Sequence, residues 1–73
     1  MIDTDYEILV ASVPDRDNPV VEVWLGKNLL AELRSEGHKV LIEIYPQPSE
    51  NAWTLDLEQF LQAIAAAKTK LLG

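Results

Sequence analysis

Glutamates are the residues of this sequence whose type and spacing come nearest to supporting chemistry. Glu22, Glu32 and Glu43 fall in three successive β-rich segments, and Glu32 with Glu43 is the one pair that we consider for acid and base catalysis. Paired carboxylates act as general acid and base where a pocket withdraws them from water. An open sheet face offers neither a pocket nor desolvation. It also gives a hard cation few converging oxygens, and no spacing here matches a calcium loop.

Other patterns of catalysis and cofactor binding are missing from the sequence. The single histidine, His38, is predicted in a turn beside Lys39, where a solvated side chain is the better interpretation and no catalytic triad can be assembled. The chain contains no cysteine, which excludes disulfides and cysteine-based metal sites. Neither GxGxxG nor GxxxxGK[ST] occurs. We therefore expect no enzymatic activity, no metal and no cofactor.

Size and charge narrow the class of protein. The 73 residues are predicted to form a single domain, 1–73, because so short a chain buries only one core. Twelve acidic residues against six basic ones give a net charge of −6, which repels nucleic-acid phosphates and attracts basic protein surfaces. No signal-peptide pattern and no apolar run of roughly 20 residues is present. We expect a cytoplasmic protein that binds neither nucleic acid nor membrane.

Four β-rich segments precede one helical segment, with prolines, glycines and Asp or Asn between them. The predicted strands are Tyr6–Val13, Val20–Leu25, Leu29–Ser35 and Lys39–Tyr45. A three-residue turn at Gly26–Asn28 and a two-residue turn at Glu36–Gly37 join the last three strands. Asp56 with Gln59 has the capping-box spacing, so the helix should begin near Leu57. The predicted fold is α+β, a four-stranded antiparallel β-meander with one C-terminal α-helix packed on one face (ββββα).

Alternation along the strands assigns the side chains to two faces of the sheet. The predicted turns place Leu25 opposite Leu29 and Leu33 opposite Val40, and both registers gather apolar residues on one face. We expect the helix to cover this face as the core, which comprises Val21, Val23, Leu25, Leu29, Ala31, Leu33, Val40, Ile42 and Ile44. The other face carries a mixed set, namely Glu22, Trp24, Leu30, Glu32, Arg34, Lys39, Leu41, Glu43 and Tyr45.

The mixed face is the first candidate for binding a partner. Glu22 is predicted directly opposite Glu32, and Glu43 one diagonal step from Glu32, which like-charge repulsion disfavours. Trp24 and Tyr45 add the aromatic area that is typical of protein interfaces. The alternative is a merely solvated face whose basic residues neutralise the glutamates.

An acidic loop is the second candidate for the contact surface. Asp15 and Asp17 flank Arg16 between two prolines, and an ordinary solvated turn is the alternative there. The residues alone do not decide between the loop and the mixed face.

Most of the chain carries a further pattern, in the stretches EVWLGKNLLAEL and VLIEIYPQP and in the spacing W-x-L-x4-F-x2-A-x3-A-x3-L. Over Val21–Leu72 this resembles small immunity proteins of bacterial toxin systems. The resemblance implies an acidic cytoplasmic protein that binds and neutralises a basic toxin domain through the mixed face or the acidic loop. The other hypothesis is a structural or regulatory module that self-associates through the same face. We expect the protein to be a monomer or a weak homodimer. Added salt should slow association with a basic partner but tighten an acidic homodimer.

Overall fold

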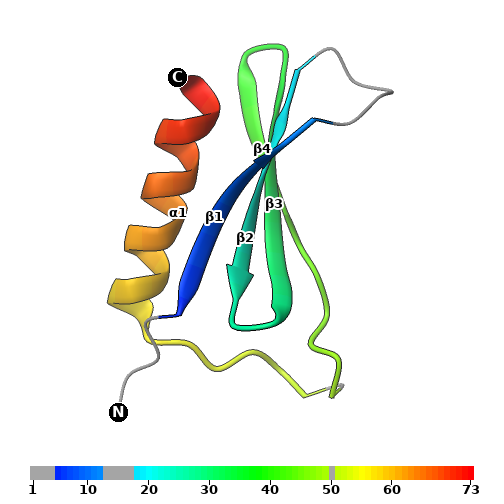
Figure 1. Ribbon diagram of the computed structural model, residues 1–73, viewed down its shortest axis with the longest axis vertical. Coiled ribbons are helices and arrows are strands. Elements are labelled where there is room, and N and C mark those ends of the chain that lie inside the picture. Colours follow the sequence, from blue (N-terminus) through cyan, green and yellow to red (C-terminus); the bar gives the residue numbers. More distant parts are fainter. Residues whose placement is uncertain (1–4, 13–17, 50) are drawn as a thin grey trace.

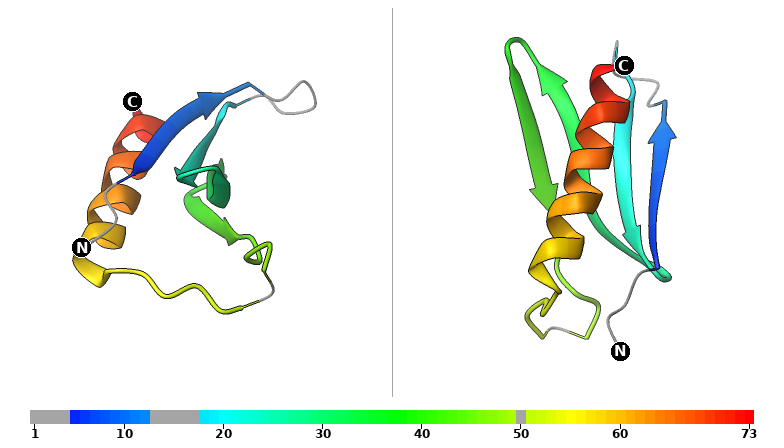
Figure 2. Two further views of the ribbon diagram at one scale, coloured as in Figure 1. Left: turned by 60° about the horizontal axis from the view of Figure 1, so that its bottom comes forward. Right: turned by 90° about the vertical axis from the view of Figure 1, so that its left-hand side faces the viewer.

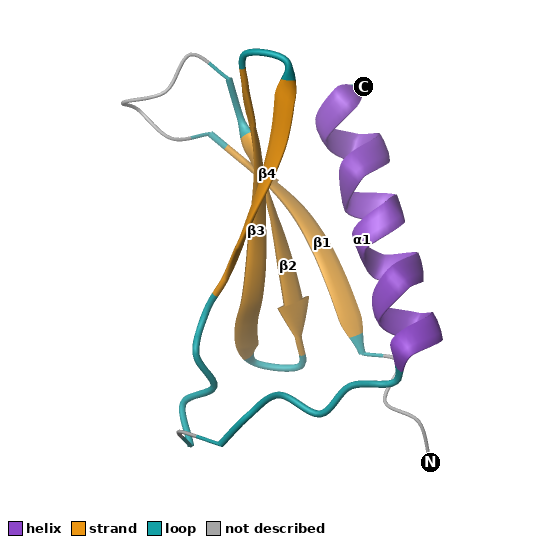
Figure 3. Cartoon of the chain, turned by 180° about the vertical axis from the view of Figure 1, so that it is seen from behind, coloured by secondary structure: helices purple, strands orange, loops and turns teal. Residues whose placement is uncertain are grey.

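Four strands and one helix make up the computed structural model, which describes residues 5–12, 18–49 and 51–73 (Figure 1). The elements are β1 (Tyr6–Ala11), β2 (Val20–Leu25), β3 (Asn28–Glu36), β4 (Lys39–Ile44) and α1 (Leu57–Leu72). Neighbouring strands pair antiparallel in the order β1-β2-β3-β4. The predicted ββββα fold of the α+β class is thereby confirmed, and Figure 3 shows the sheet and α1 as two layers.

Both tight hairpins have two-residue turns that begin with a glycine of positive φ. Gly26 and Gly37 each have a φ of 62°, a conformation that glycine adopts without steric cost. In the second hairpin Glu36 pairs with Lys39, so the turn lies one residue later than predicted. Leu33 therefore faces Ile42 and not Val40. Because the register moves by two residues, every side chain of β4 keeps its predicted face.

A β-bulge in the first tight hairpin offsets the difference between the predicted three-residue turn and the observed two-residue turn. Leu25 pairs with Asn28 and Trp24 with Leu29, so the predicted pairing of Leu25 with Leu29 is wrong. The register shifts between Val23 and Trp24, so that Val23 pairs with Ala31, as it would in a hairpin that pairs Leu25 with Leu29. The bulge leaves one extra residue on β3, and Leu30 joins the hydrophobic core at 1% exposure. The prediction that placed Leu30 on the mixed face and Leu29 in the core is therefore wrong.

Helix α1 begins at its predicted cap. The Asp56 carboxylate accepts a hydrogen bond from the backbone N–H of Gln59 at 3.0 Å, and the helix starts at Leu57. Two small residues, Ala63 and Ala67, are buried and let the helix approach the sheet closely. The core cluster consists of Val21, Val23, Leu30, Ala31, Leu33, Ala63 and Ala67. In the described part of the chain, no helix combines the length and the apolar character that crossing a bilayer requires.

The helix covers only three of the four strands. It packs on β1, β2 and β3, while the twisted sheet turns β4 away from it (Figure 2). Val40, Ile42 and Ile44 lie on the helix side of the sheet as predicted, yet they are exposed, Ile42 to 45%. Their predicted place in the core is therefore wrong. Alternation assigns a side chain to a face, but it does not determine how far a helix reaches across that face.

Candidate functional site

Three glutamates lie side by side across the face of the sheet that α1 leaves uncovered. Glu22 on β2 pairs with Glu32 on β3, and Glu32 pairs with Glu43 on β4. The direct opposition of Glu22 and Glu32 is confirmed, whereas Glu43 is directly opposite Glu32 and not one diagonal step away. Cβ atoms of directly opposed residues lie about 4.5 to 5.5 Å apart, so each adjacent pair concentrates negative charge. We call Glu22, Glu32 and Glu43 the glutamate row.

One arginine contacts the end of the glutamate row. Arg34 Nη1 lies 3.0 Å from Glu43 Oε1, and Arg34 Nε lies 2.9 Å from Glu36 Oε2. The hydrogen bond to Glu36, with further support from Glu43, raises the pKa of Arg34 above its ordinary value. The guanidinium group of Arg34 therefore forms ion pairs with both Glu36 and Glu43. Within the described residues no cation forms an ion pair with Glu22 or Glu32.

Trp24 is held beside the row by one of its members. The indole Nε1 donates a hydrogen bond to Glu22 Oε1 at 3.0 Å, and the side chain is half-buried. On the sheet Trp24 lies between Glu7 of β1 and Leu29 of β3. A tryptophan whose N–H is satisfied and whose ring is part-exposed combines a fixed orientation with apolar contact area.

Tyr45 lies in the field of the same carboxylates. Partial burial raises its pKa above the ordinary value of 10.0, and the negative charges of Glu32 and Glu43 act in the same direction. Its backbone N–H donates to the Leu30 carbonyl at 2.9 Å, which holds the residue at the end of β4. Tyr45 therefore presents a neutral hydroxyl donor next to the row at neutral pH. We call the glutamate row, Trp24, Arg34 and Tyr45 the acidic face.

Strand β1 adds two residues to this face that the sequence did not assign. Leu9 pairs with Glu22 and Glu7 pairs with Trp24, so an exposed leucine and a fourth glutamate border the site. No signal in the sequence could place them, because a long connection between β1 and β2 leaves the register open. The other predicted contact residues, Asp15 and Asp17, lie outside the described residues. His38 is exposed in the turn between β3 and β4.

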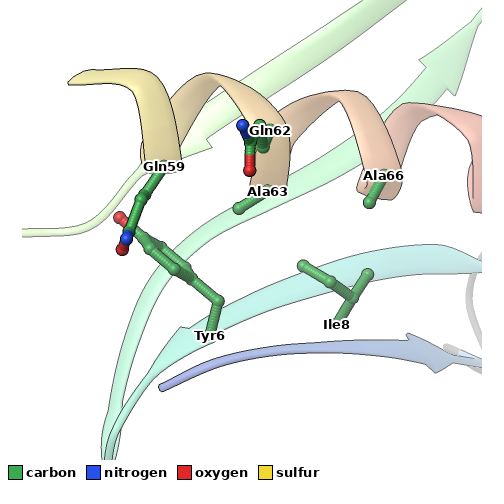
Figure 4. Close-up of a pocket in the computed structure, with 6 residues that line it drawn as sticks. All are labelled: Tyr6, Ile8, Gln59, Gln62, Ala63 and Ala66. Carbon is green, nitrogen blue, oxygen red and sulfur yellow. The ribbon is translucent and has the colours of Figure 1, made fainter. Parts of the chain in front are cut away.

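A pocket lies on the other side of the sheet, between β1 and α1. Its volume is about 320 Å³, and it is lined by Tyr6, Ile8, Gln59, Gln62, Ala63 and Ala66 (Figure 4). Gln59 Oε1 is buried with no hydrogen-bond partner among the described residues. The lining holds no carboxylate or histidine, so this hollow brings no acid and base together. Among the residues that the structure describes, no group of three or more His, Cys, Asp or Glu is arranged to hold a metal ion.

Comparisons of this chain with protein-family models, with curated proteins and with solved structures returned no match.

Proposed function

We propose that this chain is a non-catalytic binding domain whose acidic face docks onto a basic protein. The observation that carries the proposal is the direct opposition of three glutamates across β2, β3 and β4. Like charges directly opposite each other on a sheet are destabilising, by an amount on the order of the roughly 0.2 to 1 kcal/mol that a favourable cross-strand pair contributes. A partner that brings lysines or arginines to the row would remove this repulsion, so the face is better suited to the complex than to the free protein.

Aromatic residues beside the row supply the second part of the interface. Trp24 and Tyr45 are half-buried and border the carboxylates, which is the arrangement of an apolar anchor next to charged groups. Anchors of this kind supply most of the binding energy and slow dissociation, whereas surrounding charges set the association rate. The same arrangement favours binding over catalysis, because Glu43 is 53% exposed and general acid catalysis requires a carboxyl group that is withdrawn from water.

The more specific proposal is an immunity protein that neutralises a basic bacterial toxin domain in the cytoplasm. Two things support it, namely the resemblance carried by residues 21–72 and the net charge of −6. Enzymes that act on nucleic acids present basic substrate grooves, and an acidic face seated in such a groove excludes the substrate. Self-association of two acidic faces is less favourable, since two glutamate rows would meet in one interface.

Charge reversal on the row is the test. The parent chain and the variants Glu32→Lys and Glu43→Lys are used to capture basic proteins from the native cell, and the captured protein is then titrated with each variant. Both variants should associate more slowly than the parent, and the difference should shrink at high salt because long-range attraction is screened.

Glu58→Lys is the matched control, since it changes the net charge equally at an exposed position in the first turn of α1. It should leave the association rate nearly at the parental value. Equal effects of Glu32→Lys and Glu58→Lys would show that net charge alone attracts the partner, and the acidic face would lose its assigned role.

A further inference from the structure

The two edges of the sheet differ in what lies against them. At the β1 edge the Lys70 ammonium group approaches the Ile8 carbonyl at 3.4 Å, so a side chain of α1 occupies a backbone acceptor. At the β4 edge Trp53 Nε1 donates to the Tyr45 carbonyl at 2.8 Å, just beyond the last residue of the strand. Among the described residues no side chain bonds the backbone of Val40 or Ile42 in this way, and α1 packs on the other three strands (Figure 2). Edge strands with unpaired backbone groups are sites where another strand can add to a sheet.

The hydrogen-bond pattern of β4 shows which of its backbone groups point outward. Tyr45 donates its backbone N–H to Leu30 on β3. Bonding directions alternate along an antiparallel strand, so Glu43, Leu41 and Lys39 also turn their backbone groups toward β3. The backbone N–H and C=O groups of Val40 and Ile42 therefore point to the open edge.

The side chains of β4 are complementary to those of a second, antiparallel copy of the same strand. If Leu41 pairs with its own counterpart, Lys39 lies directly opposite Glu43 of the second copy, and this charge pair occurs twice. The same register places Val40 opposite Ile42 of the second copy, and the outward backbone groups of these two residues then bond each other. Charge, apolar contact and backbone direction all agree on one register.

We propose that the protein forms a two-fold homodimer by antiparallel pairing of β4 with β4 of a second copy, with Leu41 on the two-fold axis. The two sheets become one sheet of eight strands. Both helices lie on one side and both acidic faces on the other, so the dimer leaves the binding face of the proposed function accessible. The dimer is a separate claim from that function, because it rests on backbone pairing at the edge of the sheet, and Glu43 is the one residue of the acidic face that takes part in it.

Exposed apolar side chains on the helix side of β4 also favour pairing with a second copy of the chain. Val40, Ile42 and Ile44 are exposed there, and pairing joins the rows of two copies into one strip. Helix α1 turns Gln59, Gln62 and Ala66 toward β1 (Figure 4), which directs Leu57 and Leu61 to its opposite flank. Leu57 and Leu61 are 64% and 50% exposed, so α1 also carries exposed apolar side chains on the flank that faces away from β1.

Sedimentation equilibrium of the full chain, with charge variants, tests the register. Lys39→Glu and Glu43→Lys each turn both interchain pairs repulsive, so each should raise the dimer dissociation constant about tenfold or more. An equimolar mixture of the two variants restores two opposite-charge pairs and should dimerise about as well as the parent. Lys27→Glu, in the turn between β2 and β3, carries the same charge change as Lys39→Glu and should affect the dimer much less.

Cysteine crosslinking tests the axis directly, because the parent chain contains no cysteine. In a glutathione redox buffer Leu41→Cys should form a disulfide-linked dimer, since opposed residues of a non-hydrogen-bonded pair have Cα atoms about 4.5 Å apart. Ile42→Cys, one residue along the strand, should not crosslink, because its counterpart is displaced by two positions. A parent chain that stays monomeric up to millimolar concentration, or faster crosslinking at Ile42 than at Leu41, would overturn the proposal.

Discussion

Truncating Leu30 should destabilise the protein far more than truncating Ile42, although alternation along the strands assigns Leu30 to the uncovered face and Ile42 to the core. Leu30 is 1% exposed and belongs to the core cluster, whereas Ile42 is 45% exposed. The difference arises from the β-bulge, which brings Leu30 inside, and from the position of α1, which leaves β4 uncovered. The comparison therefore tests two tertiary features at once.

The magnitudes follow from burial. Leu30→Ala opens a cavity in a closed cluster and should cost about 2 to 5 kcal/mol of unfolding free energy. Full burial of an isoleucine contributes about 1.5 to 3 kcal/mol, and Ile42 is only about half buried with no enclosed cavity to create, so Ile42→Ala should cost about 1 kcal/mol. In a domain of this size 1 kcal/mol corresponds to about 4 to 8 °C in Tm.

Urea unfolding and thermal unfolding, followed by circular dichroism, measure both variants. The protein concentration should be low enough to keep the chain monomeric, because the proposed dimer would bury Ile42 further. Leu29→Ala is the matched control, since Leu29 differs from Leu30 by one position but lies next to Trp24 and is only half-buried. Equal losses for Leu30→Ala and Ile42→Ala would refute the bulge and the uncovered strand together.

Three further predictions concern the acidic face, one on binding of a partner and two on the free protein. Trp24→Ala should weaken binding of a captured basic partner by about 30-fold or more in a calorimetric titration, because an aromatic anchor contributes about 2 kcal/mol or more, and an unchanged affinity would remove Trp24 from the interface. Glu32→Gln should stabilise the free protein by about 0.2 to 1 kcal/mol per relieved pair in urea unfolding, and a loss of stability would show that repulsion in the row is already compensated. The same Glu32→Gln change should lower the pKa of Tyr45 in a spectrophotometric titration, since the charge of Glu32 helps to raise it.

The raised pKa of Tyr45 predicts the direction in which stability changes with pH. The folded state holds the phenol proton more tightly than the unfolded state. The contribution of Tyr45 to the unfolding free energy is therefore complete below the ordinary pKa of 10.0 and declines as pH rises through the pKa of the folded state. Unfolding free energy should fall above about pH 10, and it should fall less steeply in Tyr45→Phe. An identical slope in the two proteins would mean that the hydroxyl of Tyr45 does not contribute.

Local chemistry by itself determined the element order and the helix start. Asp56 caps α1 through a contact within three residues, and glycine at positions 26 and 37 specifies tight turns, so neither feature needs the rest of the fold. Side chains of a strand alternate with a period of two residues. The predicted faces of the β4 side chains were therefore correct, because a register error of two positions in the second hairpin returns each residue to the same face.

Only the tertiary structure decided where the core ends and how the glutamates meet. A one-residue difference in turn length, offset by a bulge, determines whether Leu29 or Leu30 is buried, and no local preference resolves one residue. The twist of the sheet against a single helix leaves Ile42 in solvent. The register of β4 places Glu43 directly opposite Glu32, and this position depends on a backbone pairing across the sheet that composition and periodicity do not encode.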